Sequence, residues 1–265
     1  MMKLDDRYSD DAIFNGRIKV RQRREGYRFS IDALLLAWYA SAIPGGSALE
    51  LGSGCGVVSL ALASKRPKMQ IDALEIQDSL FELALFNVRA NGLKNVEISR
   101  LDLREIEGAR WEHRYDLVFS NPPFRAVGRG RLNPEPEKAR ARHELLATLD
   151  DVVSCAARTL KPDGSAAVVL LPEREAELDK AAADNELAIV HKCLVKPYAS
   201  RMANILLVLL RTGSIRKAIE SELVLYDEAG DYSALARAII DGQWDRIEHP
   251  LSETAGLLPE IRTNN

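Results

Sequence analysis

Four consecutive residues, Asn121-Pro122-Pro123-Phe124, combine side chains that could hold a flat amine. Two adjacent prolines fix the backbone and remove two amide donors, so the turn presents its carbonyl groups rigidly. A carbonyl and the Asn121 side-chain oxygen could accept both hydrogens of an NH₂ group, while Phe124 offers an aromatic face to a planar ring. The plainer interpretation is an ordinary strand-ending turn. We predict instead a catalytic site, formed by Asn121, Pro122 and Phe124, that works chiefly by orienting the amine.

A glycine-rich segment, Glu50-Leu51-Gly52-Ser53-Gly54-Cys55-Gly56, has the composition of a ligand-binding turn. Glycines let the backbone approach a ligand closely and expose amide groups at the start of a helix. The G-x-G-x-G spacing with a preceding acid differs from the G-x-G-x-x-G of dinucleotide sites. It resembles the S-adenosylmethionine (SAM) binding loop of class I methyltransferases. We expect Gly52, Gly54 and Gly56 to contact the cofactor, and Glu50 either to accept loop amides or to sense the methionine ammonium group.

Two further acids follow predicted strands at the spacing that a nucleoside cofactor requires. Glu75 lies about 20 residues beyond the glycine loop, where a carboxylate can accept both ribose hydroxyls of a nicotinamide or a SAM cofactor. Asp102 follows the next strand, where it could accept from the adenine amine. Either acid alone could be a helix N-cap or a solvated loop residue. Their occurrence at successive strand ends, after the glycine loop, favours SAM.

These motifs must be positioned by alternating strands and helices. Short apolar runs predict strands at residues 48–51, 71–75, 96–99, 115–120, 166–171, 188–195 and 205–211. Amphipathic stretches predict helices at residues 30–42, 57–65, 79–91, 144–160 and 173–185, with another helix-like stretch at 233–240.

This alternation predicts an α/β fold, a doubly wound and mainly parallel seven-stranded sheet. Such sheets bind ligands at the carboxyl ends of their strands, which is where the motifs above lie. We expect an N-terminal segment with a lid helix at 1–46, a methyltransferase-like domain at 47–212, and a C-terminal appendage at 213–265.

Composition limits the partners that this chain could have. The 265 residues carry a net charge of -3, which gives no general support to a nucleic-acid partner. Two local clusters are basic, however: residues 17–28 hold six basic side chains against one acid, and residues 125–142 hold six against two. The three cysteines are far apart, which suggests a reducing compartment. No apolar run is long enough to span a bilayer, so we expect a cytoplasmic protein, monomeric and without a metal site.

Three longer stretches are similar to one family, the bacterial tRNA adenine-N6 methyltransferases that modify the adenine beside the anticodon of valine tRNA. They are Gln22–Ala37, Ala139–Glu144 and Leu223–Ser233. The N-P-P-F motif itself is shared with methyltransferases of adenine, cytosine or guanine exocyclic amines and of glutamine amides, so it does not choose among them.

The family resemblance implies roles for particular residues. Gly52, Gly54, Glu75, Asp102 and Asn121 would line the cofactor site, with Arg28 and Ser30 near the methionine end. Asn121 and Pro122 would hold the amine of an adenine splayed out of a single-stranded tRNA loop. Eight arginines of the basic clusters would hold RNA phosphates: Arg21, Arg23, Arg24, Arg125, Arg129, Arg131, Arg140 and Arg142.

Two alternatives to this assignment stay open at the level of sequence. One is a methyltransferase of ribosomal RNA guanine or of protein glutamine, which would use the same amine-holding chemistry. The other is a non-catalytic assembly factor that binds SAM and RNA. A binding module has no need to position an amine, so the intact Asn121–Phe124 motif favours an enzyme.

Overall fold

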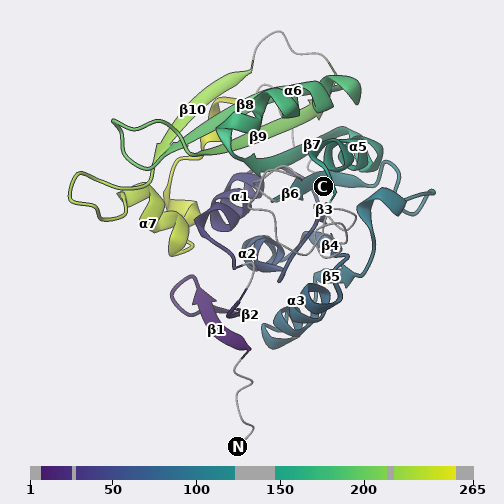
Figure 1. Ribbon diagram of the computed structural model, residues 1–265, viewed down its shortest axis with the longest axis horizontal. Helices are drawn as coiled ribbons and strands as arrows, with labels where there is room; N and C mark the ends of the chain where they lie inside the picture. The colour runs from purple at the N-terminus through teal and green to yellow at the C-terminus, as the bar shows by residue number, and fades with distance from the viewer. Residues whose placement is uncertain (1–6, 26–27, 123–146, 214–217, 255–265) are drawn as a thin grey trace, which may run out of the picture.

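The computed structural model describes residues 7–25, 28–122, 147–213 and 218–254. Its centre is an eight-stranded sheet, and a separate two-stranded hairpin, β1 with β2, lies beside it (Figure 1). The strands are β1 (Tyr8–Ile13), β2 (Ile18–Arg23), β3 (Ser47–Leu51), β4 (Gln70–Leu74), β5 (Val96–Ser99), β6 (Tyr115–Ser120), β7 (Leu160–Leu170), β8 (Leu187–Lys196), β9 (Ile205–Thr212) and β10 (Ile219–Val224).

The order of strands in the large sheet is β10-β8-β9-β7-β6-β3-β4-β5. Strand β9 runs antiparallel to both of its neighbours, and all the other pairs are parallel. The chain moves outward from β3 to β4 and β5, then returns to place β6 on the other side of β3. This reversal of strand order lies between β3 and β6, and the carboxyl ends of the strands at such a point are the usual ligand position in these sheets.

Helices cover both faces of the sheet, because alternate strand residues point to opposite faces. Leu117 and Phe119 of β6 join the core beneath α1, α2 and α3, whereas Val118 joins the core beneath α5 and α6. The helices are α1 (Ile31–Ser41), α2 (Val57–Lys65), α3 (Asp78–Ala90), α5 (Leu149–Thr159), α6 (Glu175–Asp184) and α7 (Ala234–Ile240).

The predicted count of seven strands was wrong, because residues 219–224 form an eighth strand. β10 pairs in parallel with β8 at the edge of the sheet. Its sequence, IESELV, has three consecutive polar residues and fully buries only Leu223, so its apolar signal is weak. An edge strand needs little apolar sequence, because its pairing comes from backbone hydrogen bonds.

The N-terminal segment contains a hairpin that hydrophobic patterning did not indicate. In β2 the side chains of Ile18, Val20 and Gln22 are buried, while the basic residues between them face outward. Two asparagines hold this strand: Asn87 on α3 bonds the backbone of Arg21 in both directions, and Asn91, the C-cap residue of α3, bonds that of Lys19. Asn87 also donates to the Cys55 carbonyl at 2.9 Å, so the hairpin is tied to the glycine segment.

No helix within the described ranges has the length and apolar character needed to cross a membrane.

Candidate active site

Strand register brings three predicted site residues into one row. Leu51 of β3 pairs with Ser120 of β6 and with Leu74 of β4. The residues that follow these three positions, Asn121, Gly52 and Glu75, therefore leave neighbouring strands at the same level. Adjacent strands are about 4.8 Å apart, so the row can contact a single ligand.

The glycine spacing is explained by backbone conformation. Gly52, Gly54 and Gly56 all have positive φ angles, of 74°, 59° and 84°, which other residues rarely adopt. A Cβ added at Gly52 would meet no atom of the described residues within 4 Å, so these residues leave the space beside Gly52 open. A Cβ at Gly56 would lie 3.3 Å from the Ala84 Cβ. The first glycine therefore leaves room for a ligand, and the last one allows α2 to pack closely on α3.

Glu50 lies beneath the glycine segment and is 1% exposed. Its carboxyl group accepts from the backbone amide of Ser59 at 3.2 Å and also from the Ser59 hydroxyl. Burial raises the pKa of Glu50 to about 8, because the charged form is poorly solvated there. These contacts are made to α2 and not to amides of the glycine segment, so both roles expected for Glu50 stay predictions.

Glu75 braces the glycine segment from the neighbouring strand. One carboxylate oxygen accepts from the Gly54 amide and the other from the Gln77 amide, both at 2.8 Å. Burial is the largest influence on Glu75 and raises its pKa, although these amide bonds oppose the shift. Each oxygen has a second lone pair, so the predicted bonds to ribose hydroxyls are compatible with these contacts.

Asp102 is engaged by a neighbour that the spacing did not indicate. Its carboxylate accepts from the backbone amide of Arg104 at 2.9 Å and faces the Arg104 guanidinium. These bonds to Arg104 lower the pKa of Asp102. Asp102 is therefore ionised, and its side chain is only partly free to accept from an adenine amine.

Asn121 is held by a residue that the site prediction did not include. Its side-chain nitrogen donates to the Oδ2 of Asp32 at 2.7 Å. Asp32 is 2% exposed, and its other oxygen accepts from the Ser30 hydroxyl. The structure thus brings Ser30 to Asn121 through Asp32. The available signal was an acid in the first turn of a helix, within the segment similar to the family.

Arg28 lies apart from this group, with its contacts on the hairpin. Its guanidinium donates to the Ser9 hydroxyl at 2.8 Å and to the Asp11 carboxylate at 3.2 Å. The expected position near the methionine end of the cofactor stays a prediction.

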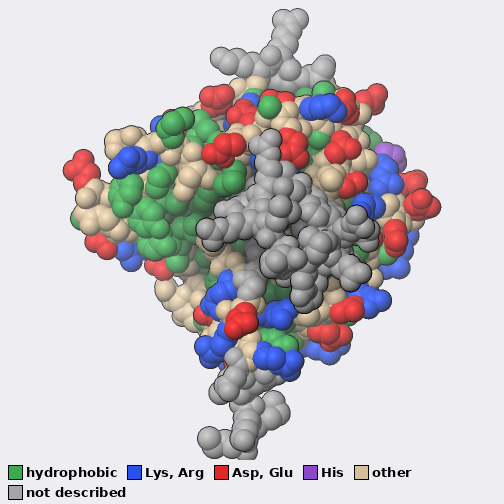
Figure 2. Space-filling view, viewed as in Figure 1, with side chains coloured by type: hydrophobic (Ala, Val, Ile, Leu, Met, Phe, Trp, Pro, Cys, Tyr) green, Lys and Arg blue, Asp and Glu red, His purple; other side chains and the backbone are tan. Residues whose placement is uncertain are grey.

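Basic residues of the hairpin face solvent next to α3, and Figure 2 shows Lys and Arg side chains gathered over β1, β2 and α3. Arg21 pairs with Asp10, with a shortest distance of 2.6 Å, and its guanidinium lies 4.2 Å from the centre of the Phe86 ring. Arg24 donates to the Tyr8 carbonyl, and Arg23 is exposed. The predicted residues Phe124, Arg125, Arg129, Arg131, Arg140 and Arg142 lie outside the described residues.

Two histidines pack against α1, away from the row of Asn121, Gly52 and Glu75 at the strand ends, here called the strand-end row. His191 shares a hydrogen bond of 2.8 Å with the Tyr39 hydroxyl, and His249 bonds the Trp38 carbonyl at 3.0 Å. Burial lowers the pKa of each to about 4. Both are therefore neutral at physiological pH and serve the core.

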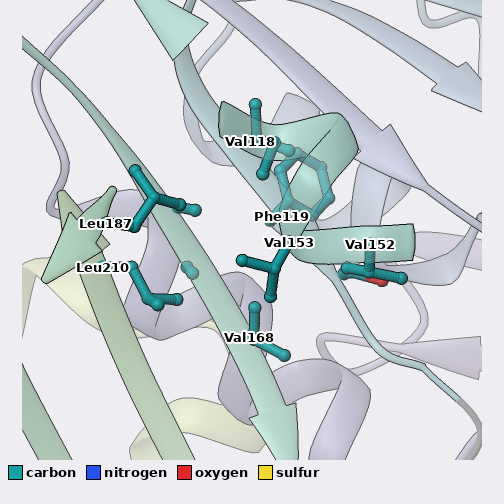
Figure 3. A pocket seen from close by; sticks show the side chains of 11 residues that line it. Val118, Phe119, Val152, Val153, Val168, Leu187 and Leu210 are labelled. Atoms are coloured by element: carbon teal, nitrogen blue, oxygen red, sulfur yellow. The ribbon is translucent and has the colours of Figure 1, made fainter. Parts of the chain in front are cut away.

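Two cavities of the described residues lie away from the row of Asn121, Gly52 and Glu75. One is an apolar void of about 10 Å³ between β6, β7 and α5. Its lining side chains, among them Val118, Val153 and Val168, are shown in Figure 3. It has room for about one water molecule. An open cavity of about 450 Å³ lies near Arg17 and Lys65, at the end of α2 away from the glycine segment. Neither one identifies the site, which rests on strand register and donor chemistry.

The residues at the ends of β3 and β4 have the chemistry needed to bind SAM. Gly52 leaves open space, and the Ser53 hydroxyl is buried with no hydrogen-bond partner among the described residues. Glu75 supplies carboxylate acceptors at the next strand end. A nucleoside with hydroxyl donors and an amino-acid tail matches this set of donors and acceptors.

Comparisons with known proteins agree with this geometry. The model of the methyltransferase small domain matches residues 31–181. A tRNA1(Val) (adenine(37)-N6)-methyltransferase of Aeromonas salmonicida is 30% identical over 81% of this chain and 89% of its own length.

Solved structures share the fold. A predicted O-methyltransferase from Agrobacterium tumefaciens has a TM-score of 0.65 at 18% identity, over 80% of this chain and 96% of that one. P. horikoshii TYW2, solved in complex with MeSAdo, has a TM-score of 0.54 at 17% identity, over 78% of this chain and 72% of that one. The chain therefore belongs to the methyltransferase small domain family and is an enzyme that uses SAM.

Proposed function

We propose that this enzyme methylates the exocyclic N6 amine of an adenine in tRNA, next to the anticodon of valine tRNA. The observation that carries the proposal is the position of Asn121 at the end of β6, level with Gly52 and with its amide nitrogen bound to Asp32. Its side-chain oxygen is then the group left to accept from a substrate. The Aeromonas salmonicida relative acts on this kind of amine, according to its name.

Asn121 and the residue that follows it would hold the substrate amine. Asn121 would accept one hydrogen of the target amine, and the carbonyl of Pro122 would accept the other. The amine is thereby oriented for in-line attack. SAM, when bound, supplies a methyl group on a sulfonium, which is already activated. Orientation and exclusion of water then account for most of the rate enhancement, and a strong general base is unnecessary.

Cofactor contacts follow from the same register. Glu75 would accept from the ribose hydroxyls, Asp102 from the adenine amine, and the amides of the glycine segment would face the methionine end. We keep Arg28 and Ser30 as candidates for that end.

The hairpin would supply part of the RNA surface. Lys19, Arg21 and Arg23 alternate along the outward face of β2, which spaces their charges along one line. Phosphate contacts by such residues raise affinity without reading sequence. Reversing the charge of Arg23 and Arg24 should weaken tRNA binding and make the loss of affinity with salt less steep, because fewer counterions are released on binding, with little change in SAM affinity. Unchanged tRNA affinity would argue against this surface.

Methyl transfer from labelled SAM to separate pools of tRNA, ribosomal RNA and protein tests the proposal. We expect label in tRNA alone. Label in ribosomal RNA or in protein would replace the proposed acceptor by a guanine amine or a glutamine amide. Label in none of the pools, from protein shown to bind SAM, would favour a non-catalytic SAM-binding factor.

A further inference from the structure

Asp32 is a buried acid whose position is not explained by the needs of its helix. It is the second residue of α1 and is 2% exposed. A buried carboxylate is costly unless hydrogen bonds compensate for lost water. Among the described residues, no lysine or arginine forms a salt bridge with it. Its hydrogen-bond partners among the described residues are the Asn121 amide, at 2.7 Å, and the Ser30 hydroxyl.

The start of α5 offers a comparison for an aspartate at the second position of a helix. α5 also has eleven residues with an aspartate second, Asp150, and its N-cap Thr148 forms a capping box with Asp151. Asp150 is exposed. At α1 the N-cap Ser30 makes no capping bond, and its hydroxyl turns to Asp32 instead. At the start of α1, Asp32 therefore bonds Asn121 and Ser30 bonds Asp32, and Ser30 forgoes the capping bond that would stabilise the helix.

The partner of Asn121 determines which way its amide faces. An ionised carboxylate only accepts hydrogen bonds, so Asn121 must present its NH₂ end to Asp32. The planar amide then turns its oxygen away from Asp32. Without Asp32 the amide could rotate by half a turn and present donors to an amine, which is itself a donor. The carboxylate also polarises the amide and makes its oxygen a stronger acceptor.

We propose that Asp32 is a positioning residue for methyl transfer, which fixes and polarises the Asn121 amide so that its oxygen receives the substrate amine. The inference rests on the proposed function, because it assigns Asn121 the amine. It places the start of α1 in the catalytic machinery, with Ser30 as the second donor that holds Asp32.

Replacement by an isostere tests this role. Asp32→Asn keeps the size of the side chain but removes the charge that selects the NH₂ end of Asn121. We expect kcat to fall about 10- to 100-fold, the range for loss of a hydrogen bond to a charged group. The SAM dissociation constant should change less than about twofold. The matched control is Asp150→Asn, the same change at the same position of α5, which should leave kcat unchanged.

Exchanging the two partners separates positioning from a merely structural role. Asn121→Asp alone places two carboxylates together and should abolish most transfer. Combining it with Asp32→Asn restores one N–H donor facing one carboxylate, so the double variant should recover at least tenfold over Asn121→Asp. The apo proteins should show the same order in urea unfolding midpoint, with the double variant above Asn121→Asp.

The outcomes are distinguishable. The positioning role would be overturned if Asp32→Asn kept the wild-type kcat. It would also be overturned if the double variant were no better than Asn121→Asp in both activity and unfolding midpoint. Absence of transfer by the wild-type protein to any acceptor pool would instead overturn the proposed function.

Discussion

The two halves of the sheet differ in strand length and in what lies at the strand ends. The half made of β6, β3, β4 and β5, here called the site half, has parallel strands of four to six residues. The half made of β7, β9, β8 and β10, here called the buttress half, includes strands of eleven, eight and ten residues. Strands that end early leave backbone and polar side chains for a ligand, whereas long antiparallel neighbours build an apolar core.

The buried acids of the sheet follow the same division, although Ser165 and His191 are buried polar residues of the buttress half. Glu50, Ser53 and Glu75 are buried in the site half, where hydrogen bonds or a ligand must satisfy them. In the buttress half, five consecutive β9 residues from Leu206 to Leu210 are fully buried and apolar. The comparison indicates that stability and chemistry are supplied by different parts of one sheet. Substitutions should therefore affect one property without the other.

The largest effect on stability is expected from a core truncation in the buttress half. Leu207→Ala should lower the free energy of unfolding by about 2–5 kcal/mol, because it removes buried contacts and leaves a cavity. Urea unfolding measures this loss, and SAM affinity at low temperature should be unchanged. Met202→Ala, at a side chain that is 90% exposed, is the control and should stay within about 0.5 kcal/mol of wild type. A large loss of SAM affinity in Leu207→Ala would contradict the claim that the buttress half supplies stability and the site half supplies SAM binding.

In the site half, a substitution of Glu75 should weaken SAM binding more than it lowers stability. Glu75→Gln keeps the shape but loses a charged acceptor, so SAM should bind about 10- to 100-fold more weakly, which is the range for hydrogen bonds to charged groups. Calorimetric titration with SAM measures the change. Glu97→Gln on neighbouring β5, where the acid is exposed, should bind SAM as wild type does. Equal affinity in the two variants would remove Glu75 from the cofactor site.

Glu50 should make the stability of the site half depend on pH. Its pKa in the folded protein is about 8, above its ordinary value of 4.5, so folding favours the protonated carboxyl group. This contribution to stability is complete below the ordinary pKa and is lost as pH rises through the folded value. Glu50→Gln should remove that loss, and its advantage in unfolding free energy should grow between the two pKa values. A parallel pH dependence in both proteins would contradict the burial of a protonated Glu50.

The smallest effect is expected at the hairpin. The side chains of Arg21 and Asp10 are 28% and 48% exposed, so their ion pair is screened by water. Asp10→Asn should change the unfolding free energy by less than about 1 kcal/mol. A loss as large as that of Leu207→Ala would show that the hairpin stabilises the sheet as the buttress half does.

Sequence patterns predicted the site half well because it consists of local motifs. β5, β6 and α2 occupy the predicted ranges, and the glycine spacing matched three positive φ angles. β10 and the hairpin were missed because edge pairing and the Asn87 and Asn91 bonds are long-range and leave little apolar pattern.

The same limit applies to individual site residues. Asp32 and Asn121 are 89 positions apart, so no spacing rule joins them. Arg104 engages Asp102 through a local turn whose geometry the spacing did not specify. The sequence identified the residues at the strand ends, and packing determined which of them contact one another.

The most direct test is the identity of the methylated nucleoside. Unmodified valine tRNA is incubated with SAM and either wild-type protein or Asn121→Ala, then digested to nucleosides and analysed by mass spectrometry. Our account predicts N6-methyladenosine from the wild-type protein and almost none from Asn121→Ala, at SAM affinities that differ little. Another methylated nucleoside, or an equal yield of N6-methyladenosine from Asn121→Ala, would contradict it.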